Sequence, residues 1–158
     1  YIILWEEMMI SRNYIIKERL INKSSEYLYN KWTTKEGLNS FFSVDNDINI
    51  IPLGKYEIYF TKEKLTARGS EGCVVLSFIP NKMLSFTWNT PPSFPELRNS
   101  GYYTWVVIEF ISQGAKQTLV RLTNLGYPAD GSWDRAEAYF EKAWDYVMDE
   151  LVKSGEVE

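Results

Sequence analysis

The chain of 158 residues contains no histidine and only one cysteine, Cys73. The absence of histidine excludes Ser-His-Asp and Cys-His nucleophilic systems, histidine-ligated zinc and most general bases that work at neutral pH. A lone cysteine excludes an intrachain disulfide and a cysteine-cluster metal site, and its apolar surroundings indicate a small buried hydrophobic residue. We therefore expect no metal, no cofactor and no catalytic residue of these types. An enzyme would have to work with carboxylates, tyrosine, lysine or arginine.

Basic charge and long apolar runs are also scarce. The 17 lysines and arginines are outnumbered by 21 aspartates and glutamates, which gives a net charge of −4. This charge argues against nucleic-acid binding, because phosphate contacts need a concentrated basic surface. No apolar run approaches the roughly eighteen residues of a membrane span, and the acidic start of the chain lacks the basic leading region of a secretory signal. We therefore predict a cytoplasmic protein with no membrane span.

The chain begins without an initiator methionine, which makes Met8 or Met9 a candidate natural start. We therefore assign residues 1–10 to an N-terminal extension, and leave open whether residues 1–8 belong to the native protein. No linker or internal repeat divides the rest, whose length is typical of one domain. A single domain is expected over residues 11–158.

Aromatic residues are abundant at 16%, and such side chains suit either a large core or a ligand cavity. Through the middle of the chain apolar residues recur with a period of two, which is typical of half-buried antiparallel strands. One such alternation places Val74, Leu76 and Phe78 on a single face. Strands are predicted at residues 13–22, 45–51, 55–61, 71–80, 82–89, 103–112 and 116–125.

Two short helices are predicted after the first strand. The segment 24–32 begins with Ser24 as its N-cap. Thr33 and Glu36 then have the spacing of a capping box, which would open a second helix running into the two phenylalanines that follow. The alternative for this second motif is a coincidence within a turn.

From Ser132 to Lys153 apolar residues recur at spacings of three and four, which predicts one long amphipathic helix capped by Ser132. Its length of about 33 Å is enough to cross a sheet. The expected fold is α+β: a curved antiparallel sheet of about seven strands, two short helices after the first strand and the long C-terminal helix across the sheet. One helix cannot fill the whole concavity, so we expect a cavity between the sheet and the helix.

Four segments carry a family resemblance, in order and at natural spacing along residues 14–153. They are SSEYLYNKWTTKEGL, the strand LGKYEIYF, the hairpin EGCVVLSFIPNKMLSFTW, and the last hairpin with its Gly-aromatic-Pro turn, YTWVVIEFISQGAKQTLVRLTNLGYP. The chain resembles the helix-grip (SRPBCC) superfamily of START lipid-transfer domains, polyketide cyclases and Bet v 1-like proteins. Within it, the chain is most similar to bacterial homologues of the activator of the 90-kDa heat-shock-protein ATPase. It departs from the family pattern at Gln117-Thr118, where Gly-Thr is usual.

The resemblance implies a helix-grip fold and, by analogy with some relatives, binding of hydrophobic or polyketide-like small molecules. Eukaryotic co-chaperones of this family carry a separate N-terminal domain that contacts the chaperone. We expect no room for such a domain in this chain, so the resemblance does not imply chaperone activation.

Candidate ligand-binding residues lie on strand faces directed at the helix, in the proline-rich loop 89–101 and on the helix. For each apolar candidate the alternative is a place in the core. Trp88 ends its strand beside the loop, and Arg98 either meets an acidic group of the ligand or is exposed. The candidates are Tyr56, Ile58, Phe60, Trp88, Phe94, Arg98, Val106, Ile108, Phe140 and Trp144.

The loop 89–101 keeps two apolar residues, Phe94 and Leu97, among three prolines. Prolines lower the entropy cost of holding one loop shape. We therefore predict that the loop is a lid whose apolar side chains close over the pocket or against a neighbouring subunit.

Charged residues within the strands are expected to be structural. Glu109 and Arg121 are predicted to form a cross-strand pair, in preference to acid-base catalysis. The same face carries Tyr103, Trp105 and Val107, an apolar stripe that can bury against a second copy of the chain. A homodimer through this face is therefore a candidate assembly.

The favoured function is noncovalent binding of an apolar or aromatic small molecule in the cavity, with the loop 89–101 as its lid. The first alternative is a cyclase- or hydrolase-type enzyme that uses a cavity carboxylate with a perturbed pKa. The second is a chaperone-interacting domain that activates an ATPase. The absence of histidine weakens the case for an enzyme, and the identity of the ligand stays open.

Overall fold

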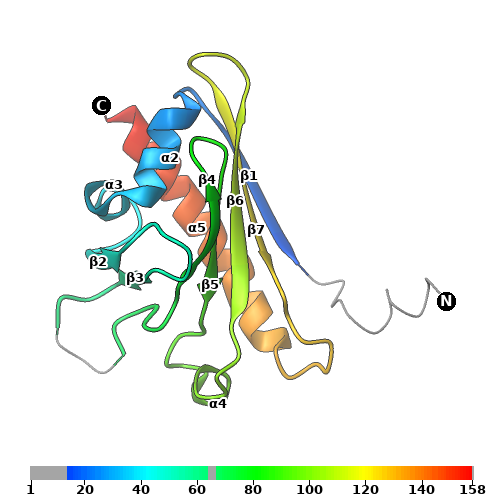
Figure 1. The fold of residues 1–158 in the computed structure, drawn as a ribbon. Coiled ribbons are helices and arrows are strands. Elements are labelled where there is room, and N and C mark those ends of the chain that lie inside the picture. Colours follow the sequence, from blue (N-terminus) through cyan, green and yellow to red (C-terminus); the bar gives the residue numbers. More distant parts are fainter. Residues whose placement is uncertain (1–13, 64–66, 158) are drawn as a thin grey trace.

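The structure, a computed structural model, describes residues 14–63 and 67–157, so the predicted extension at residues 1–10 lies outside it. Figure 1 shows the long helix α5 crossing behind the strands, with α2 and α3 together at one end. The elements in chain order are β1 (Ile15–Ile21), α2 (Ser25–Thr33), α3 (Lys35–Asn39), β2 (Asp45–Ile48), β3 (Tyr56–Tyr59), β4 (Val75–Ile79), β5 (Met83–Trp88), α4 (Pro95–Arg98), β6 (Thr104–Ser112), β7 (Thr118–Leu125) and α5 (Asp134–Glu156).

The described strands form a five-stranded sheet in the order β1-β7-β6-β5-β4 and a two-stranded sheet of β2 and β3. All neighbours in both sheets are antiparallel. Backbone hydrogen bonds join the two sheets, because Tyr56 N donates to Cys73 O at 2.9 Å and Leu53 N donates to Val75 O at 2.8 Å. The predicted α+β fold, with its short helices and its long C-terminal helix, is confirmed.

Alternate residues of the central strands build the core. Every second residue of β6 and β7 is buried over most of their lengths, and Val106, Ile108 and Leu122 are fully buried. Phe140 and Trp144 of α5 belong to the same cluster. The period of two in the strands and the spacing of three and four in the helix therefore meet at one apolar interface.

The caps of the short helices lie close to where the sequence places them. Ser24 caps α2 as predicted, because its Oγ accepts a hydrogen bond from the backbone N–H three residues further on, at 3.1 Å. Helix α3 is capped by Thr34, whose Oγ1 accepts from Gly37 N at 3.0 Å. The capping box predicted at Thr33 is wrong, because that hydroxyl donates to Tyr29 O within α2.

The start of α5 also differs from the prediction. Trp133 is the N-cap and makes no side-chain capping bond. Ser132 does not cap the helix, because its Oγ donates to Asp130 Oδ1 at 2.6 Å. The segment before α5 is therefore held by a local turn, and the helix begins where the apolar spacing begins.

Strand β4 contains a register shift between Val75 and Ser77. The extra residue of such a bulge changes which side chains face inward. Val75 is fully buried, whereas Leu76 is 38% exposed and Phe78 is only partly buried. The alternation that groups Val74, Leu76 and Phe78 on a single face therefore does not identify the buried side of β4, because Val75 is the fully buried residue.

Helix α5 is fixed to the edge strand β1 by ion pairs along one flank. Lys17 Nζ lies 2.7 Å from Glu141 Oε1 and 2.8 Å from Asp145 Oδ2. Arg19 Nη2 lies 3.0 Å from Asp145 Oδ1 and 2.9 Å from Asp149 Oδ1. Hydrogen bonds from Lys17 and Arg19 hold the pKa of the Asp145 carboxyl below its usual range. The acidic flank of α5 is thus turned towards β1.

Two further predictions about single residues are confirmed. Glu109 and Arg121 are direct neighbours across β6 and β7, and their charged groups lie 3.6 Å apart. Cys73 is fully buried, and burial raises the pKa of its thiol to about 12, so the thiol stays protonated at neutral pH. Glu109 and Arg121 therefore form an ion pair across the sheet, and Cys73 is a buried residue of the fold.

Candidate ligand-binding site

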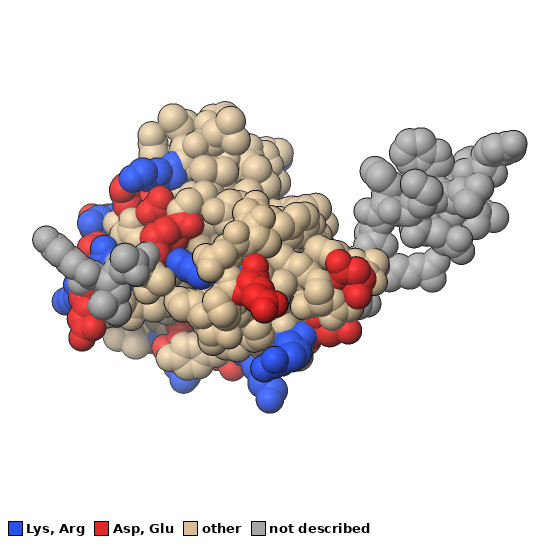
Figure 2. Space-filling view, turned by 90° about the horizontal axis from the view of Figure 1, so that it is seen from below, with Lys and Arg blue, Asp and Glu red and all other residues tan. Residues whose placement is uncertain are grey.

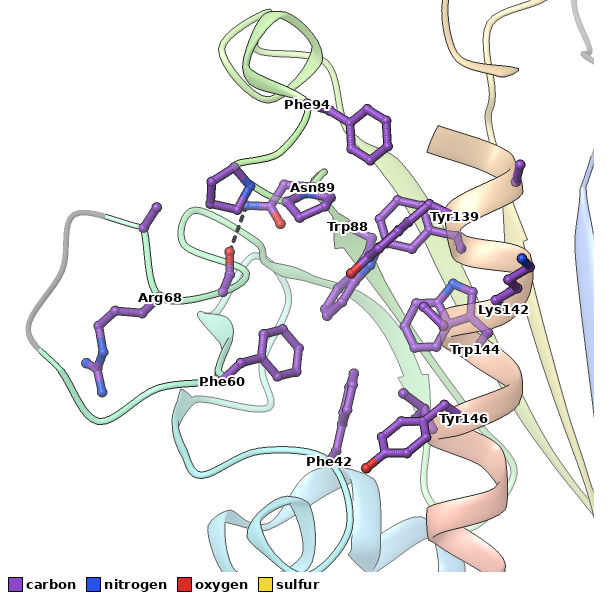
Figure 3. Close-up of a pocket in the computed structure, with 18 of the residues that line it drawn as sticks. Phe42, Phe60, Arg68, Trp88, Asn89, Phe94, Tyr139, Lys142, Trp144 and Tyr146 are labelled. Carbon is purple, nitrogen blue, oxygen red and sulfur yellow. Dashed lines mark hydrogen bonds between the residues drawn. The ribbon is translucent and has the colours of Figure 1, made fainter. Parts of the chain in front are cut away.

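A pocket of about 980 Å³ lies between α5, the end of β5 and the loops that follow β3 and β5. A volume of this size is typical of sites that enclose small molecules. Figure 3 shows aromatic side chains directed into it from both sides. Nine of its described lining residues are aromatic: Phe41, Phe42, Phe60, Trp88, Phe94, Tyr139, Phe140, Trp144 and Tyr146.

The inner wall of the pocket is a cluster of buried rings. Phe42 stacks on Trp88 with ring centroids 5.8 Å apart, and Trp88 meets Trp144 at 5.1 Å. Phe140 stacks on Trp144 one turn earlier on α5, at 6.4 Å. All four side chains are at most 9% exposed. The rings therefore support one another and leave a closely packed apolar surface behind the pocket.

The outer part of the pocket carries aromatic residues that are not buried. Phe60 is 51% exposed, Tyr139 is 45% exposed and Tyr146 is 66% exposed. Figure 3 shows the rings of Tyr139 and Tyr146 reaching from α5 across from Phe60. Exposed aromatic rings that converge on a concave surface are characteristic of a binding site rather than of a core.

The proline-rich loop closes one end of the pocket. Pro91, Pro92 and Phe94 line it, and the ring of Phe94 meets that of Tyr139 edge-on at 5.8 Å. The sequence places a structureless loop here, whereas residues Pro95–Arg98 form the short helix α4. Through this ring contact Phe94 connects the loop to α5. Figure 2 views this end of the molecule and shows acidic and basic side chains interspersed among uncharged residues.

Trp144 is held from behind by a buried asparagine. Asn124 Oδ1 accepts hydrogen bonds from Trp144 Nε1 at 3.1 Å and from Tyr127 Oη at 2.6 Å. Asn124 Nδ2 donates to Thr104 Oγ1 at 3.2 Å and to Trp105 O at 3.0 Å. Burial, with the nearby carboxylates of α5, raises the pKa of Tyr127, so its hydroxyl remains a donor. This network orients the indole that forms part of the inner wall.

The charged side chains that line the pocket are Arg68, Arg135 and Lys142. Among the lining residues that the structure describes there is no aspartate or glutamate. Arg68 is engaged elsewhere, because its Nε and Nη2 donate to Thr61 O at 3.2 Å. Figure 3 shows its guanidinium turned away from Trp88. The guanidinium of Arg135 lies 6.0 Å from the centroid of the Phe94 ring.

The ten predicted ligand-binding residues fall into three groups. Phe60, Trp88, Phe94, Phe140 and Trp144 line the pocket. Four others belong to the fully buried core and do not line it: Tyr56, Ile58, Val106 and Ile108. The alternation of the strands identifies residues that face inward, but an inward residue reaches the pocket only where α5 leaves space above it.

Arg98 is the third group. The sequence left it either as a partner for an acidic group of the ligand or as an exposed residue, and the structure shows neither arrangement. Its side chain is 14% exposed, so it is not a free loop arginine. Nη1 donates to Gly69 O at 3.0 Å and to Thr90 O at 2.7 Å, while Nη2 lies 3.3 Å from Glu71 Oε2. Arg98 therefore ties the proline loop to the β3–β4 connection and does not line the pocket.

Several lining residues escape the sequence interpretation. Phe41 and Phe42 follow α3, and the sequence interpretation treats them only as the end of the second predicted helix. Tyr139 and Tyr146 lie seven positions apart on α5, a spacing that places them on one helix face outside the apolar stripe. Two tyrosines on one flank of the predicted helix, outside its apolar stripe, are the sequence feature that could have indicated these two lining residues.

The described parts of the chain contain no cluster of three or more Cys, Asp or Glu side chains arranged to hold a metal ion. None of the helices in those parts combines the length and the hydrophobicity that crossing a bilayer requires.

The fold is similar to that of several solved proteins. The crystal structure of protein MLL2253 from Mesorhizobium loti has a TM-score of 0.72 and 20% identity, over 90% of this chain and 96% of that one. The solution structure of the Aha1 dimer from Colwellia psychrerythraea has a TM-score of 0.60 and 22% identity, over 90% and 95%. CalU16 from Micromonospora echinospora has a TM-score of 0.64 and 14% identity, over 88% and 71%. At these identities the likeness shows the helix-grip fold alone.

No curated protein sequence matches the chain. A family model does: the one described as "Activator of Hsp90 ATPase homolog 1-like protein" matches residues 22–156. This match covers most of the chain: it begins directly after β1 and includes every element from α2 to the end of α5. The chain therefore belongs to the family of Activator of Hsp90 ATPase homolog 1-like proteins.

Proposed function

We propose that this protein binds an apolar or aromatic small molecule without covalent chemistry, in the pocket between α5 and the sheet. The observation that carries the proposal is the set of aromatic residues that line a concave volume of about 980 Å³. Exposed rings such as Phe60 and Tyr146 lose apolar contact with water when a ligand covers them, and this favours binding. In this proposal the loop 89–101 acts as the lid.

The enzyme alternative depends on a carboxylate that faces the cavity. The described lining residues include arginine, lysine and tyrosine but no acidic group that could act as a general acid or base. The geometry therefore supports binding better than carboxylate catalysis. The ATPase-activator alternative is suggested by the family description alone.

A panel of fatty acids, sterols and polycyclic aromatic compounds is expected to contain members that raise the melting temperature. A ligand present at 100 times its Kd stabilises a protein by about 2.7 kcal/mol, which corresponds to roughly 5–10 °C for a chain of this length. Differential scanning fluorimetry measures the shift. If no compound of the broad panel raises the melting temperature, the proposal is wrong.

Filling the pocket tests whether a stabilising compound acts there. Ala143 lines the pocket and is only partly buried, so Ala143→Trp should occupy the volume and abolish the ligand-induced shift. Ala115→Trp is the matched control, because Ala115 is exposed in the turn between β6 and β7. This control should retain the full shift.

We also propose that the outer face of the sheet forms a homodimer interface. On this face Val107 and Trp105 are half-buried, while Ile16 and Leu20 of β1 are 45% and 57% exposed. In Figure 1 no described helix lies over the face of β6 and β7 that is opposite α5. The relative from Colwellia psychrerythraea is a dimer, and a two-fold contact would use the same apolar stripe on both copies.

Light scattering after gel filtration should therefore give twice the chain mass of 18.5 kDa. Val107→Glu places an unpaired charge in the interface and is expected to give a monomer. Val44→Glu, at an exposed residue before β2, should leave the dimer intact. A wild-type protein that is monomeric at high micromolar concentration would contradict the dimer.

A further inference from the structure

The composition of the pocket wall favours flat ligands over flexible chains. Beside the nine aromatic residues, Val147 is the one branched aliphatic side chain among the described lining residues. Aromatic rings bind other rings in offset-stacked or edge-on contacts, which add about 0.5–1.5 kcal/mol to the burial of apolar area. An acyl chain gains the burial term but not this additional term.

The charged side chains that line the pocket are all basic, and α5 contributes to this because it turns several of its acidic residues towards β1. Its acidic residues Glu141, Asp145 and Asp149 are engaged by Lys17 and Arg19 of β1. The residues of α5 that line the pocket include two cations, Arg135 and Lys142, and no acidic residue. The chain as a whole carries a net charge of −4, so the cationic lining is not a consequence of general composition.

Arg135 is the lining cation best placed to meet a ligand. Arg68 already donates to Thr61 O, and Figure 3 shows the side chain of Lys142 leaving α5 on the side away from Trp88. The guanidinium of Arg135 lies over the ring of Phe94, which itself lines the pocket. Within residues 14–63 and 67–157 no ion pair or side-chain hydrogen bond engages Arg135.

A guanidinium beside an aromatic ring is suited to an acidic group on a flat ligand. It presents parallel N–H donors that match the two oxygens of a carboxylate. Its contact with Phe94 restrains it before the ligand binds, which lowers the entropy cost of binding. The ligand's rings would then lie against the inner wall and its acidic group would face the end of the pocket beneath the loop 89–101.

We infer that the pocket selects flat polycyclic aromatic molecules bearing a carboxylate or another acidic group, with Arg135 as the counter-charge at the end beneath the loop 89–101. This inference rests on the proposed function and adds two properties to it: ring shape and negative charge. It also makes Arg135 a specificity-determining residue.

Four probes of matched chemistry test both properties by isothermal titration calorimetry. Pyrenecarboxylate, pyrenemethanol and pyrenemethylamine share one ring system and differ in charge, whereas dodecanoate has the acid without the rings. Pyrenecarboxylate is expected to bind about ten-fold more tightly than pyrenemethanol and pyrenemethylamine, the size of one charge-assisted hydrogen bond. It is also expected to bind more tightly than dodecanoate, which keeps the acid but makes no ring contacts.

Substitution of Arg135 separates its charge from the shape of the pocket. Arg135→Gln should weaken pyrenecarboxylate about ten-fold while changing the affinity for pyrenemethanol by less than about two-fold. Lys153→Gln is the matched control, because it removes one positive charge from the exposed C-terminal end of the same helix. It should leave all four affinities unchanged.

The outcomes distinguish this inference from the proposed function. Equal affinities for the three pyrene compounds, or an unchanged preference in Arg135→Gln, would overturn the inference while supporting an apolar binding site. Tighter binding of dodecanoate than of pyrenecarboxylate would overturn the ring preference. If none of the four probes binds but a compound of the broader panel stabilises the protein, the inference fails and the proposed function stands.

Discussion

Replacing Asn124 by alanine is expected to lower the free energy of unfolding by about 3 kcal/mol, because it leaves several buried groups without partners. The substitution removes the acceptor of Tyr127 Oη and of Trp144 Nε1, and the donor to Trp105 O. Each unsatisfied buried group costs about 1–3 kcal/mol. Urea denaturation followed by circular dichroism measures the change.

Asn49→Ala provides the matched control for this prediction. Asn49 is exposed in the connection after β2, and substitutions at such surface positions usually change stability by less than about 0.5 kcal/mol. Equal stabilities of the two variants would show that the Asn124 network does not stabilise the fold. A selective loss in Asn124→Ala would also identify this residue as the support of Trp144 in the pocket wall.

A second large effect is expected from Gly126→Ala, which should destabilise the protein by at least about 2 kcal/mol. Gly126 has a φ of 93°, in the left-handed region that an alanine adopts at a cost. A Cβ at this position would also overlap the ring of Trp105, which lies directly over the glycine. The strain therefore has a conformational part and a steric part.

Two comparisons separate these parts. Gly101 has a similar φ of 79° but open space where a Cβ would lie, so Gly101→Ala should cost only about 1 kcal/mol. In a Trp105→Ala background the additional effect of Gly126→Ala should fall to the same value. The steric explanation would be refuted by equal losses in Gly126→Ala and Gly101→Ala.

The regular elements were predictable because their signals are local. In β6 and β7 each inward residue is two positions from the next, and in α5 the apolar residues recur at three and four, so each pattern reports its own secondary structure. The N-cap of α3 was predicted at Thr33, one position before the actual cap, Thr34. Either threonine has a suitable side chain, and only the backbone geometry selects Thr34. The bulge in β4 leaves no mark in an alternating sequence.

The site was predictable only in part, for a reason of geometry. Alternation correctly indicates that Val106 and Trp88 both face inward, and both are buried. It does not indicate what covers each residue, so it cannot separate Trp88, which borders the pocket, from Val106, which lies in the core. Arg98 has a long side chain whose acceptor Gly69 O lies 29 residues away, beyond the reach of any local pattern.

The sequence by itself determined the secondary structure, the family and the chemical types absent from the protein, because these follow from composition and from short-range periodicity. Only the tertiary structure decided that α5 turns its acids towards β1 and its tyrosines towards the pocket. It also decided that Phe42, from a separate segment, meets Trp88 and Trp144. These arrangements depend on how α5 is rotated against the sheet, which the packing of the whole core selects and no single segment encodes.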